Sequence, residues 1–528
     1  YERYGARGKI EARPTETLKI TLAGDYLHSY DDATSVYTST SQTAYPTGTV
    51  TTSAPLAAFL SGVGITPSAS NRQASTSFDT HVTDKNYGGS LTGELELGDY
   101  TVTSITAYRE WKNHQFQDND GLSALTATFP QIHDEGKLAS SQFSQELRLT
   151  SPKGNFIDYV VGAYYMRAKT DETYERTVTR LISGSEVPVT GVADYGILSK
   201  NYAVFGEANF NFTSWLRAFA GYRSIWDDLS FYHERTSTND PTNSGASSLD
   251  ITSIRAYHQA QGSTSQRGDS YRGGIQLDVT PTTHAYFTYA RGYKGPAFNV
   301  FFNHTAPTNS QPIDPEKSNS FEVGFKSQWF DRIVQLNAAA FLVDYKGFQA
   351  NNFVLLNGAV VTNLTNAGTV RSKGFEADLT VAPTEGLTFR ANAAYADARV
   401  RRFNPNPLTN APDARDGTRL PLAPKFSYTI GADYDVPVGP VKLYLSSDWH
   451  HVSKQFSDLG ESGEIDPYGI WNASIGVSDA EDKYRLTFMV RNILDDSYVL
   501  LNTSAGQRLM IPRDADRYAG LNLRAKFN

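Results

Sequence analysis

The sequence contains no cysteine among its 528 residues and only 3 methionines. The absence of cysteine excludes a disulfide scaffold, thiolate metal sites and thiol catalysis. No apolar run approaches the length of a bilayer-spanning helix and the mean hydropathy is −0.43, so no helical membrane span is predicted. No basic run is present and the net charge is −8, which argues against a nucleic-acid partner because phosphate binding needs clustered lysine and arginine.

Aromatic residues and two-residue alternation are what the sequence has in abundance. The chain holds 31 tyrosines and 28 phenylalanines, a composition that favours strands over helices. The last twelve residues, RYAGLNLRAKFN, place Leu521, Leu523 and Phe527 on one face of a strand. Arg524 and Lys526 lie on the opposite face. The chain is therefore predicted to end in a strand with one apolar and one charged side.

The same alternation recurs along the whole chain and predicts about nineteen strands. They are expected near residues 3–12, 17–28, 84–96, 100–113, 139–150, 156–169, 198–211, 215–229, 267–279, 284–294, 317–329, 333–345, 361–381, 387–400, 424–435, 441–454, 467–478, 484–498 and 516–527.

The connections between these strands alternate between short and long. Short gaps such as SPKGN, TPTT and VPVGP carry the Gly, Pro, Asp and Ser of tight turns. Long polar stretches are expected near 30–82, 114–138, 170–197, 230–266, 295–316, 346–360, 401–422, 455–466 and 500–515. A large soluble β protein has no reason to gather its long loops at one end of a meander, whereas an outer-membrane barrel has short turns inside and long loops outside.

The pattern therefore predicts an all-β protein, a transmembrane antiparallel up-and-down β-barrel. Only alternate residues of a spanning strand meet lipid, which explains the low mean hydropathy. Bacterial single-chain barrels have even strand numbers, so about three strands are expected before Tyr1, for a total of about 22. Residues 1–528 would then form one barrel domain.

Seven stretches together resemble the barrel of a TonB-dependent outer-membrane receptor of the iron-complex, or siderophore, type. They are YGARGKIEARPTETLKITLAGDY (4–26), FSQELRLTSP (143–152), FTYARGYKGPAFN (287–299), PEKSNSFEVGFKSQWFD (315–331), LNAAAFLVDYKGFQ (336–349), TNAGTVRSKGFEADL (365–379) and VRNILDDSYV (490–499). The resemblance covers essentially the whole chain. The terminal strand also resembles the assembly signal of the family, except that Asn528 follows Phe527.

The resemblance implies a location in the bacterial outer membrane and the active uptake of a scarce, large solute, with a ferric siderophore as the default ligand. It implies TonB, an N-terminal plug domain and outer-membrane lipid and lipopolysaccharide as partners, with the plug and the TonB box expected upstream of Tyr1. Carbohydrate or cobalamin uptake is an alternative within the same family. A passive porin is another alternative, although porins typically have about sixteen to eighteen strands.

No catalytic constellation is present, so no enzyme activity, cofactor or metal site is predicted. The 10 histidines are scattered along the chain. The adjacent pair His450 and His451 would point to opposite faces if they lie in a strand, so these two residues are not expected to share a metal ion.

The alternation assigns a set of polar residues to the face that lines the barrel interior. That set is Lys19, Asp25, Glu146, Arg148, Glu207, Arg217, Arg223, Glu322, Lys326, Glu376, Asp378, Arg390, Asp448, His450, Arg485, Arg491 and Arg524. Most should contact water, one another or the plug. Arg223, Asp448, His450 and Arg491 lie nearer the long loops and are the candidates for substrate contact.

Loop aromatic residues are the second group of candidates. Phe298, Phe301 and Phe302 could stack on a sugar or an aryl chelate, or line the rim of the barrel, and Tyr293 is expected to be a membrane-interface anchor. The stretch APLAAFLSGVGI within 30–82 predicts either a short helix or disorder.

Overall fold

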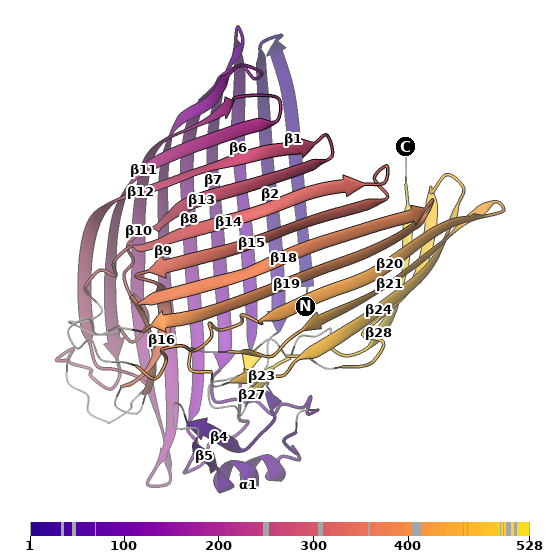
Figure 1. Ribbon diagram of the computed structural model, residues 1–528. Helices are drawn as coiled ribbons and strands as arrows, with labels where there is room; N and C mark the ends of the chain where they lie inside the picture. The colour runs from indigo at the N-terminus through magenta and orange to yellow at the C-terminus, as the bar shows by residue number, and fades with distance from the viewer. Residues whose placement is uncertain are drawn as a thin grey trace.

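The computed structural model describes residues 2–32, 36–44, 49–68, 70–245, 253–304, 310–356, 359–366, 368–403, 413–457, 459–461, 463–496, 498–499, 501–502, 508–511 and 515–526 (Figure 1). Nineteen strands form the main sheet: β1 (Glu2–Thr15), β2 (Leu18–Asp32), β6 (His81–Leu97), β7 (Tyr100–Asp118), β8 (Gln131–Thr150), β9 (Ile157–Ile182), β10 (Ser185–Asn211), β11 (Leu216–Ser237), β12 (His258–Thr280), β13 (Thr283–Lys294), β14 (Glu316–Trp329), β15 (Val334–Lys346), β18 (Thr369–Thr384), β19 (Leu387–Arg402), β20 (Phe426–Val438), β21 (Val441–Val452), β24 (Tyr468–Asp479), β25 (Tyr484–Arg491) and β28 (Tyr518–Ala525).

Smaller elements lie in the connections. They are β3 (Val36–Tyr37), β4 (Ser41–Ala44), β5 (Thr49–Thr52), α1 (Ala54–Gly62), β16 (Gln349–Leu356), β17 (Ala359–Asn366), β22 (Gln455–Phe456), β23 (Glu464–Ile465), β26 (Leu501–Asn502) and β27 (Arg508–Met510). Figure 1 shows α1, β4, β5, β16, β23 and β27 gathered at one end of the sheet, which we call the loop end. The opposite end carries the tight turns and is called the turn end.

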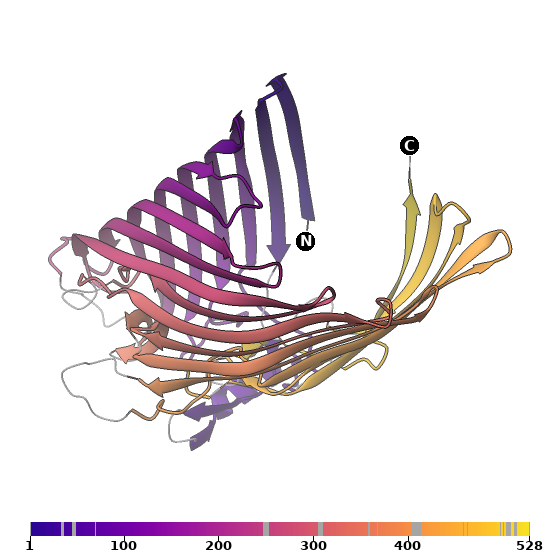
Figure 2. The same cartoon turned by 45° about the horizontal axis from the view of Figure 1, so that its top comes forward.

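The main sheet is an antiparallel meander in which each strand pairs with the next strand of the sheet along the chain, from β1–β2 and β2–β6 to β24–β25 and β25–β28. This confirms the predicted all-β, up-and-down architecture and the nineteen strands. The sheet is strongly curved, with β1 and β28 at its two edges (Figure 2). The total of 22 strands stays a prediction, and the predicted Phe527 and Asn528 lie outside the described residues.

The strands at the loop end are longer than predicted. The expected long loop 170–197 is wrong: β9 continues to Ile182 and β10 begins at Ser185, so the two strands form a continuous hairpin. Ser183 and Gly184 have positive φ values of 52° and 82°, as a tight two-residue hairpin turn requires. Stretches 114–138 and 230–266 are likewise shortened, because β7 to β8 and β11 to β12 extend into them.

Two other predicted strand limits are wrong. The strand expected at 361–381 is divided, because β17 pairs with β16 as a separate hairpin and only β18 belongs to the main sheet. The strand expected at 484–498 ends at Arg491, where Asn492 takes a positive φ of 51°.

The apolar face predicted from the alternation is exposed rather than folded into a core. Leu521 and Leu523 are 72% and 74% exposed, and Leu22 and Phe488 are also exposed. Cross-strand pairing brings Phe488 opposite Leu521 and Leu486 opposite Leu523. A water-soluble protein would not leave such a continuous apolar face uncovered.

The compact cores lie at the loop end instead. Helix α1 begins at the N-cap Ser53, whose hydroxyl accepts a hydrogen bond from the Leu56 amide, and buries Leu56 and Leu60. The sequence left a helix and disorder open for this stretch, and the helix is what forms.

Within the described residues, no helix has the length and apolar character needed to cross a bilayer.

Candidate functional site

Strands β8 to β12 carry a densely packed polar site at their loop ends. These strands contain 20, 26, 27, 22 and 23 residues. About 9–11 residues suffice to cross a membrane as a tilted strand, so the loop ends of these strands extend beyond any bilayer-spanning part. Groups placed there lie outside the hydrocarbon part of the membrane, among the loops.

One apolar core holds this region together. It contains Val178, Val189, Ala193, Tyr195, Ile254 and Phe302. Val178 and Val189 face each other across the β9–β10 hairpin, and Phe302 comes from the segment that follows β13. The core therefore fastens residues 298–304, which we call the covering segment, onto one face of the extended strands.

The Arg235 side chain holds the backbone of the covering segment in place. Its guanidinium donates to the carbonyl oxygens of Phe302 at 2.9 Å, His304 at 3.0 Å and Ala256 at 2.9 Å. Arg235 is buried, and burial lowers the pKa of its guanidinium to about 10, so the group is still charged at neutral pH. A buried cation surrounded by carbonyl oxygens acts as a strong, directional clamp.

A buried ion pair lies beside this clamp. Asp134 of β8 accepts hydrogen bonds from both Nε and Nη2 of Arg176 of β9, at 2.7 and 2.6 Å. The Tyr174 hydroxyl donates to the same carboxylate at 2.5 Å, and the Asn119 amide contacts it too. The Asp134 side chain is 1% exposed, so four groups from three chain segments are tied together away from water.

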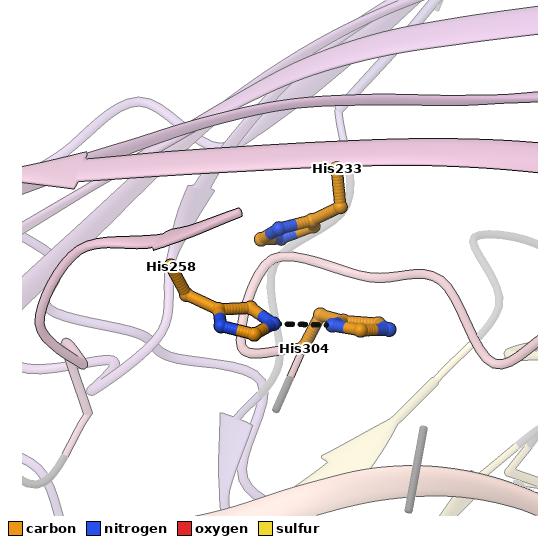
Figure 3. A group of neighbouring side chains, drawn as sticks. All are labelled: His233, His258 and His304. Carbon is orange, nitrogen blue, oxygen red and sulfur yellow. Dashed lines mark hydrogen bonds between the residues drawn. The ribbon is translucent and has the colours of Figure 1, made fainter. Parts of the chain in front are cut away.

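Three histidines converge in the same region. His233 of β11, His258 at the start of β12 and His304 of the covering segment place their rings together (Figure 3). Among the described residues they are the group whose nitrogen atoms could hold a metal ion. The sequence predicted no metal site, because these residues are separated by 25 positions or more along the chain.

The structure places the predicted candidate Arg223 midway along β11. Its guanidinium lies 5.2 Å from the ring centre of Tyr164 and 5.4 Å from that of Phe205. Both distances are within the range of cation–π attraction. A cation near two aromatic rings is suited to bind an anion or an aryl group, and a role for Arg223 in substrate contact stays a prediction.

The other three polar candidates are dispersed. Asp448 and His450 share one face of β21, where Asp448 accepts from the Asn472 amide at 2.8 Å and His450 Nδ1 lies 2.8 Å from the Thr429 hydroxyl. Arg491 is exposed at the end of β25. Over the ranges that the structure describes, no hydrogen bond or ion pair joins any two of the four polar candidates.

All three aromatic candidates belong to the covering segment, and two of them, Phe298 and Phe302, are buried. Phe302 belongs to the apolar core, and the Phe298 ring lies 4.6 Å from that of Phe231. Phe301 is half-buried. Their proposed stacking on a ligand stays a prediction, and for Phe298 and Phe302 it requires the covering segment to move.

Most of the residues predicted to line the interior have a charged or polar partner. Glu207 of β10 reaches Arg272 of β12 across Gly221, with contacts of 2.5 and 2.8 Å, because Gly221 has no side chain to keep them apart. The remaining pairs are Lys19–Glu94, Asp25–Arg109, Glu146–Arg148, Arg217–Asp278, Glu322–Tyr286, Arg390–Asp433, Arg485–Asp482 and Arg524–Asp482. Lys326, Glu376 and Asp378 are exposed.

The sequence analysis missed Asp134, Arg176, His233 and Arg235, because they fall in stretches assigned to long polar loops. The sequence of this stretch, FYHERTS, has no apolar–polar alternation that predicts a strand. The alternation is seen in the structure, where Phe231, His233, Arg235 and Ser237 are buried and the residues between them are exposed.

Comparison with known proteins gives a family and a set of relatives. A sequence profile of the family described as "TonB dependent receptor-like, beta-barrel" matches residues 23–493. The probable TonB-dependent siderophore receptor PiuA of Acinetobacter baumannii is 25% identical over 235 residues, which cover 43% of this chain and 30% of PiuA. The catecholate siderophore receptor Fiu of Escherichia coli K12 is 24% identical over 255 residues, which cover 45% of this chain and 30% of Fiu.

Solved structures extend the likeness in fold to the whole chain. The ferric yersiniabactin uptake receptor FyuA from Yersinia pestis superposes with a TM-score of 0.73 at 17% identity, over 100% of this chain and 71% of FyuA. The siderophore receptor PiuA from Acinetobacter baumannii superposes with a TM-score of 0.71 at 18% identity, over 99% of this chain and 74% of PiuA. At these identities the superpositions establish the fold alone. The sequence alignments cover less than a third of each curated relative.

Proposed function

We propose, on the premise that this chain belongs to the TonB-dependent receptor-like β-barrel family, that it takes up a ferric siderophore across the bacterial outer membrane with energy supplied through TonB. The family is one of outer-membrane receptors and not of enzymes. The siderophore as the solute is supported by the curated relatives, which are named as siderophore receptors.

The polar candidates suit a ferric chelate because of their charge and aromatic surroundings. A catecholate or hydroxamate chelate presents oxygen atoms around iron and, for catecholates, flat rings and net negative charge. Arg223, within cation–π distance of Tyr164 and Phe205, offers a cation beside two aromatic rings. Arg491 adds a second exposed cation nearer the loop end. In this proposal His450 and Asp448 contribute hydrogen bonds to the ligand.

Release is proposed to depend on partners. A plug domain would occupy the barrel interior against the polar face, where Glu207, Arg272 and their neighbours carry charges that can pair with it. TonB, acting on the plug, would open the path for the bound chelate, and outer-membrane lipid and lipopolysaccharide would surround the apolar face.

Ligand binding tests the proposal directly. The protein purified in detergent is titrated separately with a ferric catecholate, a ferric hydroxamate, cobalamin and a maltodextrin, and quenching of its tryptophan fluorescence is followed. We expect saturable quenching by a ferric chelate. Loss of a charge-assisted contact costs about 1.5–3 kcal/mol, so Arg223→Ala should weaken binding by about 10- to 150-fold.

Lys326→Ala is the matched control, because Lys326 is an exposed cation on β14 with no assigned role in ligand contact. If the protein bound cobalamin or the maltodextrin but no ferric chelate, that solute would be assigned as the substrate in place of a siderophore. Steady, large conductance in planar bilayers would instead identify a passive porin and overturn the proposal.

A further inference from the structure

The three histidines at the loop end form a compact nitrogen cluster from three separate chain segments. One ring nitrogen of each of His233, His258 and His304 lies within 4.8 Å of the others. His258 Nε2 and His304 Nδ1 are 3.0 Å apart, along the dashed line in Figure 3. The His233 ring stacks on that of His304, with ring centres 4.9 Å apart, whereas His258 and His304 lie edge to edge, with ring centres 5.1 Å apart.

We propose that His233, His258 and His304 bind one divalent first-row transition metal ion of the Zn²⁺ class, which ties the covering segment to the ends of β11 and β12. Imidazole nitrogen is a preferred ligand of Zn²⁺, Cu²⁺ and Ni²⁺. The site is independent of the siderophore proposal, because it concerns a resident ion and not the transported solute.

The nitrogen separations are close to those of a zinc site, and the His258 and His304 rings, now joined by a hydrogen bond, would turn so that both nitrogens point at the ion. Zn–N bonds are about 2.0–2.1 Å long, so two nitrogen ligands of a tetrahedral site lie about 3.3 Å apart. The pair His258 and His304 is already at 3.0 Å, and the nitrogen of His233 needs to move toward them by about 1.5 Å. Three protein ligands leave a fourth position for water.

The rings of His233 and His304 are shielded from water, since these two residues are 1% and 0% exposed. His233 Nδ1 is buried and has no hydrogen-bond partner within the described part of the chain, which leaves a lone pair or a proton uncompensated.

The frame around the rings is rigid. Phe231 and Tyr195 flank the cluster, with ring centres 5.5 Å from His304 and 5.9 Å from His233. Arg235 holds the backbone of His304 by its carbonyl oxygen. The positive charge of the Arg235 guanidinium repels a divalent cation. The site should therefore bind Zn²⁺ more weakly than a three-histidine site that has a carboxylate nearby.

Metal binding by the purified protein tests the proposal. Chelator-treated protein in detergent is titrated with Zn²⁺ by calorimetry, and bound zinc is counted after dialysis. We expect one Zn²⁺ per chain, with affinity reduced at least about tenfold in His258→Ala and in His304→Ala. His451→Ala removes a histidine of β21 outside the cluster and should leave binding unchanged.

Two further measurements keep the result decisive if a variant folds poorly. X-ray absorption of the zinc-loaded wild-type protein should report nitrogen ligands at about 2.0–2.1 Å. Hydrogen exchange of the covering segment should slow when Zn²⁺ is added, and its rate should return to the metal-free value when a chelator is added. The absence of saturable binding, a first shell of oxygen atoms alone, or equal loss of binding in His451→Ala would overturn the assignment.

Discussion

Replacing Asp134 by asparagine would remove the negative charge from the buried ion pair while preserving the size of the side chain. The guanidinium of Arg176, itself only 20% exposed, would then face an amide instead of a carboxylate. The Tyr174 hydroxyl can still donate to the amide oxygen, but the amide nitrogen takes the place of the oxygen that accepts from Arg176 Nε, so the change removes the charge and one hydrogen-bond acceptor.

The expected cost follows from the burial of both partners. Breaking a buried ion pair on one side costs about 3–5 kcal/mol, because the remaining charge has lost its counter-ion. Arg176 keeps some contact with water, so the lower limit of about 3 kcal/mol applies, or about 150-fold in the equilibrium for local opening.

Hydrogen exchange followed by mass spectrometry measures that opening. Peptides from the loop ends of β8 and β9 should lose protection by about two orders of magnitude, whereas peptides from the turn end should not change. The exposed pair Lys454–Glu464, with side chains 44% and 47% exposed, provides the control. Glu464→Gln should cost less than about 1 kcal/mol.

A double variant separates charge from shape. Asp134→Leu with Arg176→Met removes both charges and should recover most of the lost protection. If Asp134→Asn changed protection no more than Glu464→Gln does, or if the double variant were less protected than the single one, the reasoning on the buried pair would be wrong.

Two other predictions concern the loop and turn ends. Burial raises the pKa of Asp120 to about 6. Between about pH 4 and 6 the Asp120 carboxyl is therefore protonated while the β7–β8 connection is folded and ionised when the connection opens. Protection of residues 119–132, corrected for intrinsic exchange, should therefore be greatest below pH 4 and fall as the pH rises through 6; Asp120→Asn should abolish this step, and a pH-independent wild type would contradict it. At the turn end, Gly386→Ala should lower the urea midpoint of unfolding well below that of Gly439→Ala. Both glycines have positive φ, which costs alanine about 1–2 kcal/mol, but only at Gly386 does the added carbon collide with a backbone atom, the carbonyl oxygen of Asp435. Equal midpoints would refute the collision.

Strand number and strand order were predictable because each depends on a local two-residue period. Leu521, Leu523 and Phe488 alternate with polar neighbours, and the exposed face that they form follows from that pattern alone. The turn-end limits were also close to the observed ones, since Gly, Pro and Asp mark tight turns in the sequence itself.

The loop-end site was not predictable, because it depends on contacts between distant segments. The buried pair joins positions 134 and 176, and the histidine cluster joins 233, 258 and 304. Polar composition near these residues suggested loops, whereas pairing across the β9–β10 hairpin extends both strands through the polar stretch. Tertiary pairing decided the structure there, and the alternation of buried and exposed residues along β11 is visible only in the structure.

The central claim is energised uptake, and transport of radioactive iron tests it most directly. Iron-starved cells that make this protein as their single ferric-siderophore receptor are given a labelled ferric chelate, with and without a functional TonB. The account predicts accumulation that requires both this protein and TonB. Equal accumulation in the absence of TonB, or none with any ferric siderophore that binds, would contradict it.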